Sequence, residues 1–139
     1  MLVELALEEQ DHYDHPRQSA RQLEASTRPA PRGFAGESRI FLARDHSGAA
    51  LGLAWCLLFD PGNGLEAEIA ELYVRPAARG RGVAHQLCAA AMALFRSRRV
   101  TFACVWTRPD NEAALAAYRA AGFAPTEQLV LTWLPLPGR

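Results

Sequence analysis

Apolar residues recur at two spacings along the chain, and each spacing predicts a different kind of element. Short runs in which apolar residues alternate with polar ones, or follow one another between turn signals, predict strands. These runs cover residues 40–43, 51–59, 66–74, 100–106, 123–124 and 129–134. Residues 3–8 also alternate, but the same residues would equally start a helix. Both alternatives stay open for that segment.

Three segments have the spacing of helices. In residues 82–96, apolar side chains return every three or four positions and form one stripe. Residues 111–121 form an alanine-rich helix, which Asn111 would cap and Gly122 would end. Residues 17–26, which follow a proline, predict a short polar helix. The resulting order, β-β-β-α-β-α-β, favours one mixed α/β sheet, and the 139 residues fit a single domain over 1–139.

Composition restricts the partners that the chain can attract. Its 15 basic residues, all of them arginine, balance 15 acidic residues, so the formal net charge is zero. A neutral chain has no general attraction to nucleic acid, and the cluster at residues 96–99 follows a helix end, where cations complement the dipole. No apolar run reaches the ~20 residues of a membrane span. We therefore expect no nucleic-acid partner and no membrane partner.

Cysteine usage and the first residues indicate a cytoplasmic protein. Cys56, Cys88 and Cys104 are an odd number without a CxxC pair, which favours reduced core thiols. Residues 1–10 carry acids where a signal peptide has bases. The polar cluster at residues 11–15 contains two histidines and two aspartates. A His and an Asp three or four positions apart could bind a metal on a helix, but the sequence establishes no third ligand for such a pair, so we expect no metal site.

A glycine-rich turn joins the strand at 66–74 to the helix at 82–96. Gly80 and Gly82 lack Cβ atoms, which lets a diphosphate approach the backbone, and the helix start offers unpaired N–H groups. Arg79 and Arg81 add positive charge. A dinucleotide-binding G-x-G-x-x-G motif would need a third glycine where His85 stands. The turn therefore predicts a phosphate site of another class.

Two motifs resemble those of the GNAT superfamily of N-acetyltransferases. Residues 79–84, Arg-Gly-Arg-Gly-Val-Ala, are similar to its R/Q-x-x-G-x-G/A signature, and residues 71–76 resemble the strand before it. Residues 111–123 are similar to its N-x-x-A-x-x-x-Y-x-x-x-G-F block. The resemblance covers roughly residues 38–134. It implies a mixed, mostly antiparallel sheet, splayed between the fourth and fifth strands and flanked by helices.

The resemblance also implies acetyl-CoA as co-substrate, lying between the strands at 66–74 and 100–106. The residues that it assigns to cofactor binding are Leu72, Tyr73, Val74, Arg79, Gly80, Arg81, Gly82, Val83, Ala84, Asn111 and Tyr118. A primary amine of a small molecule or peptide would attack the thioester directly. The acceptor and any homodimer stay open. The alternative is a non-catalytic CoA-binding regulatory module of the same fold.

Three residues are candidates for the proton transfers of this reaction. The resemblance makes Tyr118 the acid that protonates the leaving thiolate, although helical spacing alone would make it a core tyrosine. Alternation along the strand puts Glu68 and Glu71 on opposite faces. Glu68 would share the face of Leu72 and Val74, which favours it as the base, whereas a β-bulge would reverse the argument towards Glu71.

Overall fold

The computed structural model describes Val3, Leu7 and residues 17–26 and 36–131, and within them it shows one four-stranded mixed sheet. In sheet order these strands are β1 (Gly36–Arg44), β2 (Ala50–Phe59), β3 (Glu66–Val74) and β4 (Phe102–Val105). The first three are antiparallel neighbours, and β4 pairs with β3 in parallel. The predicted α/β class is therefore confirmed.

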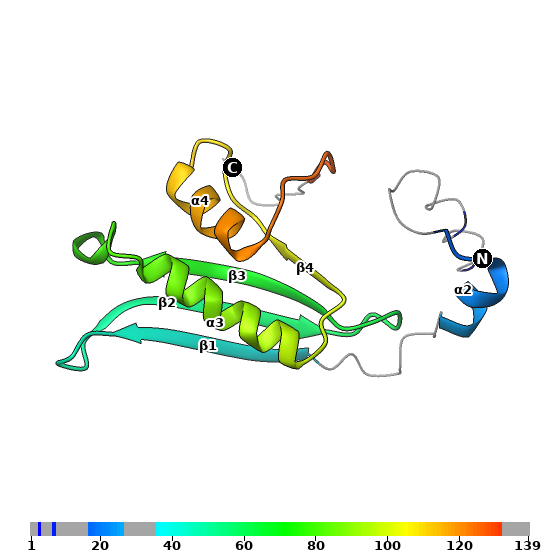
Figure 1. Cartoon of the computed structure of the whole chain (residues 1–139), viewed down its shortest axis with the longest axis horizontal. Helices are drawn as coiled ribbons and strands as arrows, with labels where there is room; N and C mark the ends of the chain where they lie inside the picture. The colour runs from blue at the N-terminus through cyan, green and yellow to red at the C-terminus, as the bar shows by residue number, and fades with distance from the viewer. Residues whose placement is uncertain (1–2, 4–6, 8–16, 27–35, 132–139) are drawn as a thin grey trace, which may run out of the picture.

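Helices pack on one face of this sheet. α3 (Val83–Ser97) lies across the first three strands, and α4 (Glu112–Ala121) lies beside it on the β4 side (Figure 1). The short 3₁₀ helix η1 (Pro76–Ala78) connects β3 to the turn before α3. α2 (Ala20–Ser26) lies apart from the sheet in this view. The two helices predicted around the glycine-rich turn and Asn111 are confirmed to within one residue.

The short polar helix begins later than its sequence predicted, at Ala20 instead of Arg17. Ser19 explains the difference, because the Gln22 N–H donates to its hydroxyl at 3.4 Å and the Ser19 N–H donates to the Gln22 side chain at 2.8 Å. This reciprocal pair is the capping box of a helix start. The cap at Ser19 therefore sets the start of α2, three residues after the start that Pro16 predicted.

The core lies between α3, α4 and the covered face of the sheet. Every second residue of β2 points into it, and Leu58 and Cys56 are almost fully enclosed. α3 contributes the stripe that its spacing predicted, with Cys88, Ala91 and Phe95 in the same cluster. The alternating residues of β2 and the apolar stripe of α3 therefore pack against each other in one core.

We expect Leu58→Ala to lower the free energy of unfolding by about 2–5 kcal/mol, because the side chain is 1% exposed and its removal leaves a cavity. Leu42→Ala is the matched control, since Leu42 is 48% exposed on the other face of β1 and should cost less than about 1 kcal/mol. Urea unfolding of both variants measures the difference. Equal losses would contradict the assignment of the covered face.

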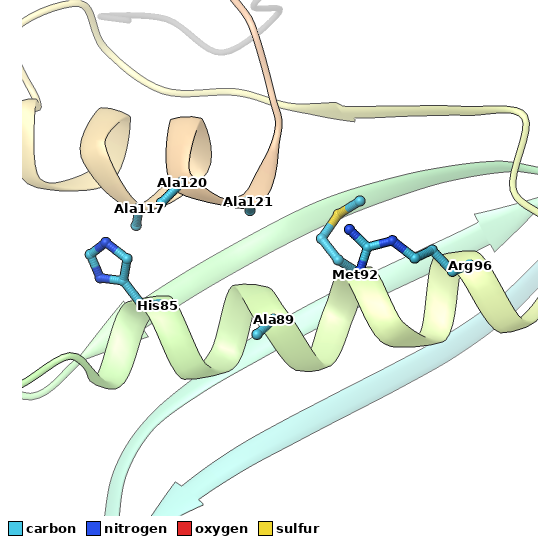
Figure 2. A pocket seen from close by; sticks show the side chains of 7 residues that line it. All are labelled: His85, Ala89, Met92, Arg96, Ala117, Ala120 and Ala121. Carbon is cyan, nitrogen blue, oxygen red and sulfur yellow. The ribbon is translucent and has the colours of Figure 1, made fainter.

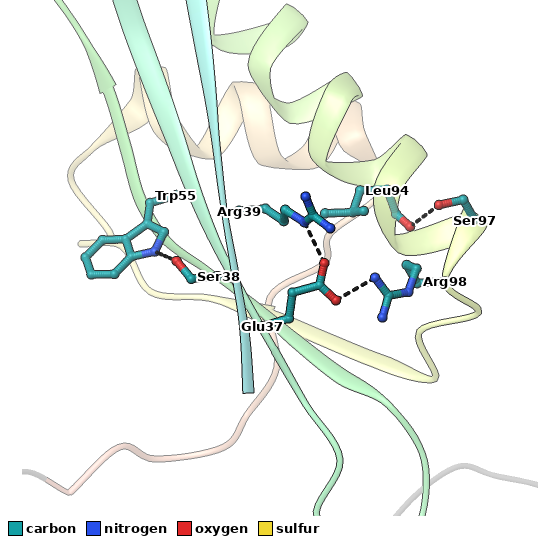
Figure 3. A network of polar contacts seen from close by, with 7 residues as sticks. All are labelled: Glu37, Ser38, Arg39, Trp55, Leu94, Ser97 and Arg98. Carbon is teal, nitrogen blue, oxygen red and sulfur yellow. Dashed lines mark hydrogen bonds and ion pairs between the residues drawn. The ribbon is translucent and has the colours of Figure 1, made fainter. Parts of the chain in front are cut away.

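A polar network ties β1 to the end of α3 (Figure 3). Glu37 pairs with Arg39 on its own strand and with Arg98 at the end of α3, each at 2.5 Å. The hydrogen bond from Arg39, followed by that from Arg98, holds the pKa of the Glu37 carboxyl below its usual range. Because these groups are at the surface, the network orients the helix end more than it stabilises the fold.

One irregularity of β3 determines which way its side chains point. Trp55 of β2 lies opposite Glu71, but the next β2 residue, Cys56, lies opposite Ile69, so Ala70 is an extra residue in β3. This is a β-bulge, and it reverses the alternation of side chains from one side of Ala70 to the other. Residues 67 and 69 before the bulge and residues 72 and 74 after it therefore all pack towards α3.

The ladder between β3 and β4 is short, and the strands part where it ends. Paired residues run from Glu66 opposite Phe102 to Ile69 opposite Val105. Beyond that point β3 continues to Val74, while the chain after β4 turns away from it (Figure 1). β3 and β4 therefore diverge beyond the ladder, whereas the predicted splay between a fourth and a fifth strand stays a prediction. The divergence lies between the third and fourth strands that the structure describes, and Val3 and Leu7, where a first strand was one alternative, are helical.

The strands predicted near the end of the described chain are absent. Phe123, Ala124 and residues 129–131 belong to no strand, and residues 132–134 lie outside the described part. Leu129 and Leu131 are about nine-tenths exposed. Three consecutive apolar residues resemble a buried strand in sequence, but a strand also needs a neighbouring strand with which to pair. That partner cannot be predicted from the segment itself.

Candidate active site

A cavity of about 550 Å³ lies where the end of β3, the glycine-rich turn and the first turns of α3 and α4 meet. It brings together the two motifs that are about 30 residues apart in the sequence. Its lining residues are Leu72, Tyr73, Val74, Ala78, Arg79, Gly80, Gly82, Val83, Ala84, His85, Asn111, Ala113, Ala114 and Ala116. Most of the lining side chains are small and apolar, and Arg79, His85 and Asn111 add polar groups.

The glycine-rich turn presents its backbone to open space. Gly80 and Gly82 have φ values of +71° and +78°, in the left-handed region that side chains disfavour. A Cβ atom at either position would meet nothing within 4 Å, so the absence of side chains leaves the backbone accessible from the cavity. Gly82 caps α3 without any side-chain hydrogen bond, and the first N–H groups of a helix have no intrahelical partner. The turn therefore has the geometry that an anionic group needs.

Arg79 is fixed beside the turn. Its Nε donates to the Val74 carbonyl at 3.1 Å, and its backbone N–H donates to Pro76 at 3.2 Å. These bonds leave the two terminal nitrogens of the guanidinium available to the cavity. Arg81, in contrast, is exposed and does not line the cavity. Of the two arginines predicted here, only Arg79 is placed by the fold at the cavity wall.

Asn111 has the capping geometry predicted for it. Its Oδ1 accepts from the Ala114 N–H at 3.2 Å, which starts α4 at Glu112. Because the cap uses the side-chain oxygen, the amide nitrogen is left to donate elsewhere. Asn111 also lines the cavity. The helix-capping role is thus confirmed, and the cofactor contact stays a prediction.

Sequence reasoning missed five lining residues: Ala78, His85, Ala113, Ala114 and Ala116. The four alanines carry no chemistry that a pattern would single out. Ala114 lies three positions after Asn111, and Ala113 and Ala116 lie three apart, so helical spacing indicates a shared side for each pair. In the sequence His85 stands out only as a residue that breaks a dinucleotide motif. Its position one turn into α3 was the available signal.

Tyr118 lies near the point where β3 and β4 part. Its ring is buried in the core cluster with Ile69, the last β3 residue paired with β4, and packs edge-on against Phe123 at 6.0 Å between ring centroids. Tyr118 does not line the cavity. Burial, and then the nearby Cys88 and Glu71, raise the pKa of its hydroxyl. The described part has no buried side-chain oxygen without a partner, and no hydrogen bond of this hydroxyl is found there, so solvent reaches the hydroxyl.

The prediction that Glu68 shares the face of Leu72 and Val74 is wrong, because it assumed a regular strand and β3 contains a bulge. Before the bulge, Glu68 points away from α3, and after it Glu71 does so too. Leu72 and Val74 point towards α3, so neither carboxylate shares their face. Both glutamates lie on the face of the sheet away from α3. Glu68 lies where β3 and β4 are still paired, opposite Cys104, whereas Glu71 lies beyond the last pair.

Comparison with known proteins agrees with this geometry. The sequence profile described as "Acetyltransferase (GNAT) family" matches residues 2–123. The chain belongs to the GNAT acetyltransferase family. Mycothiol acetyltransferases are among the relatives of this GNAT chain. The one from Thermobispora bispora is 30% identical over 86% of the chain, and the one from Salinispora tropica is 34% identical over 86%.

Those relatives are much longer than the GNAT chain described above. The matches cover 41% and 40% of the lengths of these two proteins. Solved structures show the same fold. A putative acetyl transferase from Pyrococcus furiosus has a TM-score of 0.60 and 19% identity, covering 96% of this chain and 91% of its own. AAC(6′)-Iy in complex with a CoA bisubstrate analogue has a TM-score of 0.59 and 22% identity, covering 96% and 90%.

The cysteines of the GNAT chain are held as thiols. Burial, and then Cys88, raise the pKa of Cys56 to about 11, and burial raises that of Cys88. Burial, and then Glu68, raise the pKa of Cys104 as well. A nucleophilic cysteine needs the opposite shift. None of the three cysteines therefore has the environment of an acyl-accepting thiolate.

Two kinds of feature are absent from the part of the GNAT chain that the structure describes. Residues 17–26 and 36–131 contain no group of three or more His, Cys, Asp or Glu side chains that could hold a metal ion. The cluster at residues 11–15 lies outside the described residues. In the part that the structure describes, no helix has the length and apolar character needed to cross a membrane.

Proposed function

We propose that this chain transfers an acetyl group from acetyl-CoA to a primary amine by direct attack of the amine on the thioester. The observation that carries the proposal is the 550 Å³ cavity, because both family motifs line it and the end of β3 forms its wall. Three structural features then have a joint purpose. The open glycine turn suits a diphosphate, the cavity suits a long thin ligand, and the splay of β3 from β4 gives access to the other face of the sheet.

The residues of the turn would bind the diphosphate of the co-substrate. The N–H groups of Gly82, Val83 and Ala84 start α3, so the positive end of the helix dipole lies behind them. The terminal nitrogens of Arg79 would add charge-assisted hydrogen bonds. On binding, acetyl-CoA supplies an activated acyl group with a good leaving group. The chain has to position that group and move two protons.

Tyr118 and Glu71 would move those protons. The pKa of Tyr118 is raised, so its hydroxyl keeps its proton through neutral pH and can donate it to a departing thiolate. Glu71 would accept the proton of the amine, directly or through water. Glu71 is favoured over Glu68 for two reasons. It lies beyond the last β3–β4 pair, and its charge is one of the causes that raise the pKa of Tyr118.

The acceptor would approach from the face of the sheet away from α3. Glu66, Glu68 and Glu71 lie on that face of β3, and the half-exposed Tyr73 and Trp55 lie beside them. Negative charge next to aromatic surface favours a cationic amine. AAC(6′)-Iy, an aminoglycoside N-acetyltransferase with the same fold, supports an amine acceptor. The proposal names a primary amine and no single compound.

Two measurements test the proposed function. Acetyl-CoA at millimolar concentration should raise the melting temperature, because a ligand that binds only the folded chain stabilises it. Thiol release should then be measured against a panel of primary amines that includes an aminoglycoside. Stabilisation without release for any amine would favour the non-catalytic CoA-binding module, and the absence of both effects would contradict the CoA site itself.

Glu71→Gln should remove the acid limb of the pH–rate profile, because the amide cannot accept the proton of the amine. Glu68→Gln is the matched control: it makes the same change on the same strand face but where β3 and β4 are still paired. We expect the control to keep the limb. The opposite result would assign the base to Glu68, and an unchanged limb in both variants would mean that the amine binds in its neutral form.

A further inference from the structure

The two faces of the sheet differ in what covers them. α3 and α4 lie on one face, and the hollow that remains between these helices has a volume of about 220 Å³, with His85 and Met92 in its lining (Figure 2). On the other face, Trp55 and Ile40 are 38% and 61% exposed. Large apolar side chains that gather on an uncovered surface mark a place where another molecule binds. The face away from α3, the outer face, is therefore a candidate binding surface.

Residues of the outer face form two rows that lead from β3 to β1. In the first row, Trp55 of β2 lies opposite Glu71 of β3 on one side and opposite Ile40 of β1 on the other. The second row lies beside it and consists of Tyr73, Leu53 and Leu42. Neighbouring strands are about 4.8 Å apart, so the rows provide about 10 Å of largely apolar surface between β3 and β1. A ring on a short alkyl chain covers that distance.

Ser38 fixes the indole of Trp55 on the outer face. The Trp55 Nε1–H donates to the Ser38 hydroxyl at 2.7 Å, and Figure 3 shows both side chains on the opposite side of β1 from Glu37. The N–H is the only hydrogen-bonding group of an indole, so this bond leaves the faces and edges of the ring for a ligand. A ring face attracts a cation or stacks on another ring. Trp55 can therefore bind an ammonium group or an apolar body, but it has no hydrogen bond to offer to a hydroxyl.

Glu71 supplies a negative charge at the β3 end of the first row. Side chains directly opposite each other on one face have Cβ atoms about 4.5–5.5 Å apart, so one ammonium group can contact the Glu71 carboxylate and the Trp55 ring together. Glu71 has no ion pair within residues 17–26 and 36–131. The first row therefore has a cation-binding end at β3 and an apolar end at β1.

We propose that the acceptor is a primary amine on an aromatic or similarly apolar body, with its ammonium group between Glu71 and Trp55 and its body over Trp55 and Ile40. This inference rests on the proposed function, which requires only a primary amine at Glu71. Trp55 is then a specificity-determining residue, and Ser38 is a positioning residue because it acts through the indole. A polyhydroxylated amino sugar fits this surface less well, because its hydroxyls would lie on Ile40 and Leu53, whose side chains cannot form hydrogen bonds.

The test uses the full chain with acetyl-CoA and compares kcat/KM for 2-phenylethylamine and ethylamine, two primary amines that differ by one ring. The unsubstituted chain should prefer 2-phenylethylamine by about 10- to 100-fold, the range expected for partly burying an apolar ring. In Trp55→Ala the preference should fall to about 3-fold or less. Phe102→Ala is the matched control: it removes an exposed aromatic ring from the outer face, opposite Glu66, and it should keep the preference.

Ser38→Ala tests the position of the indole without removing the ring. Loss of one hydrogen bond should raise KM for 2-phenylethylamine by about 2- to 10-fold, and it should raise KM more than it lowers kcat. Ser38→Thr restores a hydroxyl and should recover the low KM. If Trp55→Ala does not fold, this pair of variants decides whether the indole binds the acceptor.

The inference is overturned, and the proposed function stands, if the unsubstituted chain acetylates ethylamine or an aminoglycoside as well as it acetylates 2-phenylethylamine. An intact preference in Trp55→Ala, or an unchanged KM in Ser38→Ala, overturns it too. If Trp55→Ala keeps the preference but converts a dimer to a monomer in sedimentation, the ring belongs to a contact between two copies of the chain, which also overturns the inference. If no amine of the panel is acetylated, the proposed function fails, and the inference fails with it.

Discussion

Tyr118→Phe should lower kcat by about 10²–10³-fold while leaving the affinity for acetyl-CoA nearly unchanged. Its hydroxyl is proposed to protonate the thiolate as the thioester breaks, and an interaction made only in the transition state affects turnover and not ground-state binding. General acid catalysis is typically worth about 10²–10⁴-fold, and a thiolate is already a fairly good leaving group, which favours the lower part of that range.

The position of Tyr118 makes stability an informative second measurement. Its ring is 7% exposed and packs against Phe123, and the phenylalanine ring keeps that contact. The melting temperature should therefore barely change. Phe123→Leu is the matched control for packing, because it removes the edge-on ring contact and leaves the hydroxyl in place; it should lower the melting temperature with little loss of kcat. A tyrosine with only a structural role would show normal turnover in Tyr118→Phe.

The raised pKa of Tyr118 also sets the sign of a pH effect. Burial disfavours the phenolate, so the hydroxyl loses its proton only above its usual range. The proposed acid is thus fully protonated at neutral pH. Activity that declined between pH 7 and pH 9 would have to come from another group, and Tyr118→Phe should leave such a decline in place.

Gly82→Asp should weaken acetyl-CoA binding by at least about 100-fold. The new carboxylate would stand where the backbone of the turn now faces open space, next to the proposed diphosphate position. Two like charges 4 Å apart repel by roughly 4 kcal/mol at an effective dielectric constant of 20, and solvent at this turn reduces that value. The expected loss therefore corresponds to a part of the full repulsion.

Backbone strain has to be separated from this charge effect, and the chain offers a close control. Gly48 has a φ of +86° in the turn between β1 and β2, and a Cβ atom there meets nothing within 4 Å, as at Gly82 with its φ of +78°. Gly48→Asp therefore pays a similar conformational cost, roughly 1–2 kcal/mol, far from the cavity. It should lower the melting temperature by a similar amount and keep acetyl-CoA affinity. Equal binding by both variants would contradict the diphosphate site.

The local pattern of the sequence determined most of the elements. Helical spacing gave α3 and α4 within one residue of their observed bounds, and Asn111 and Gly122 end α4 as their capping chemistry predicts. The position of β3 was predicted without error. These features depend on residues within a few positions of one another, so a single sequence contains the information. The same holds for the glycines of the turn, whose positive φ values follow from the absence of a side chain.

Only the tertiary structure decided which face each strand residue occupies and where the cavity lies. The extra residue Ala70 is visible only against its neighbour β2, because alternation read along one strand cannot show that its partner advances by one residue while it advances by two. For that reason Glu68 and Glu71 share one face of the sheet, and where the β3–β4 ladder ends decides that only Glu71 lies beyond its last pair. The hollow between α3 and α4, lined by His85 and Arg96 among others, likewise exists because two helices from separate motifs pack side by side, and their contact is a long-range property of the fold.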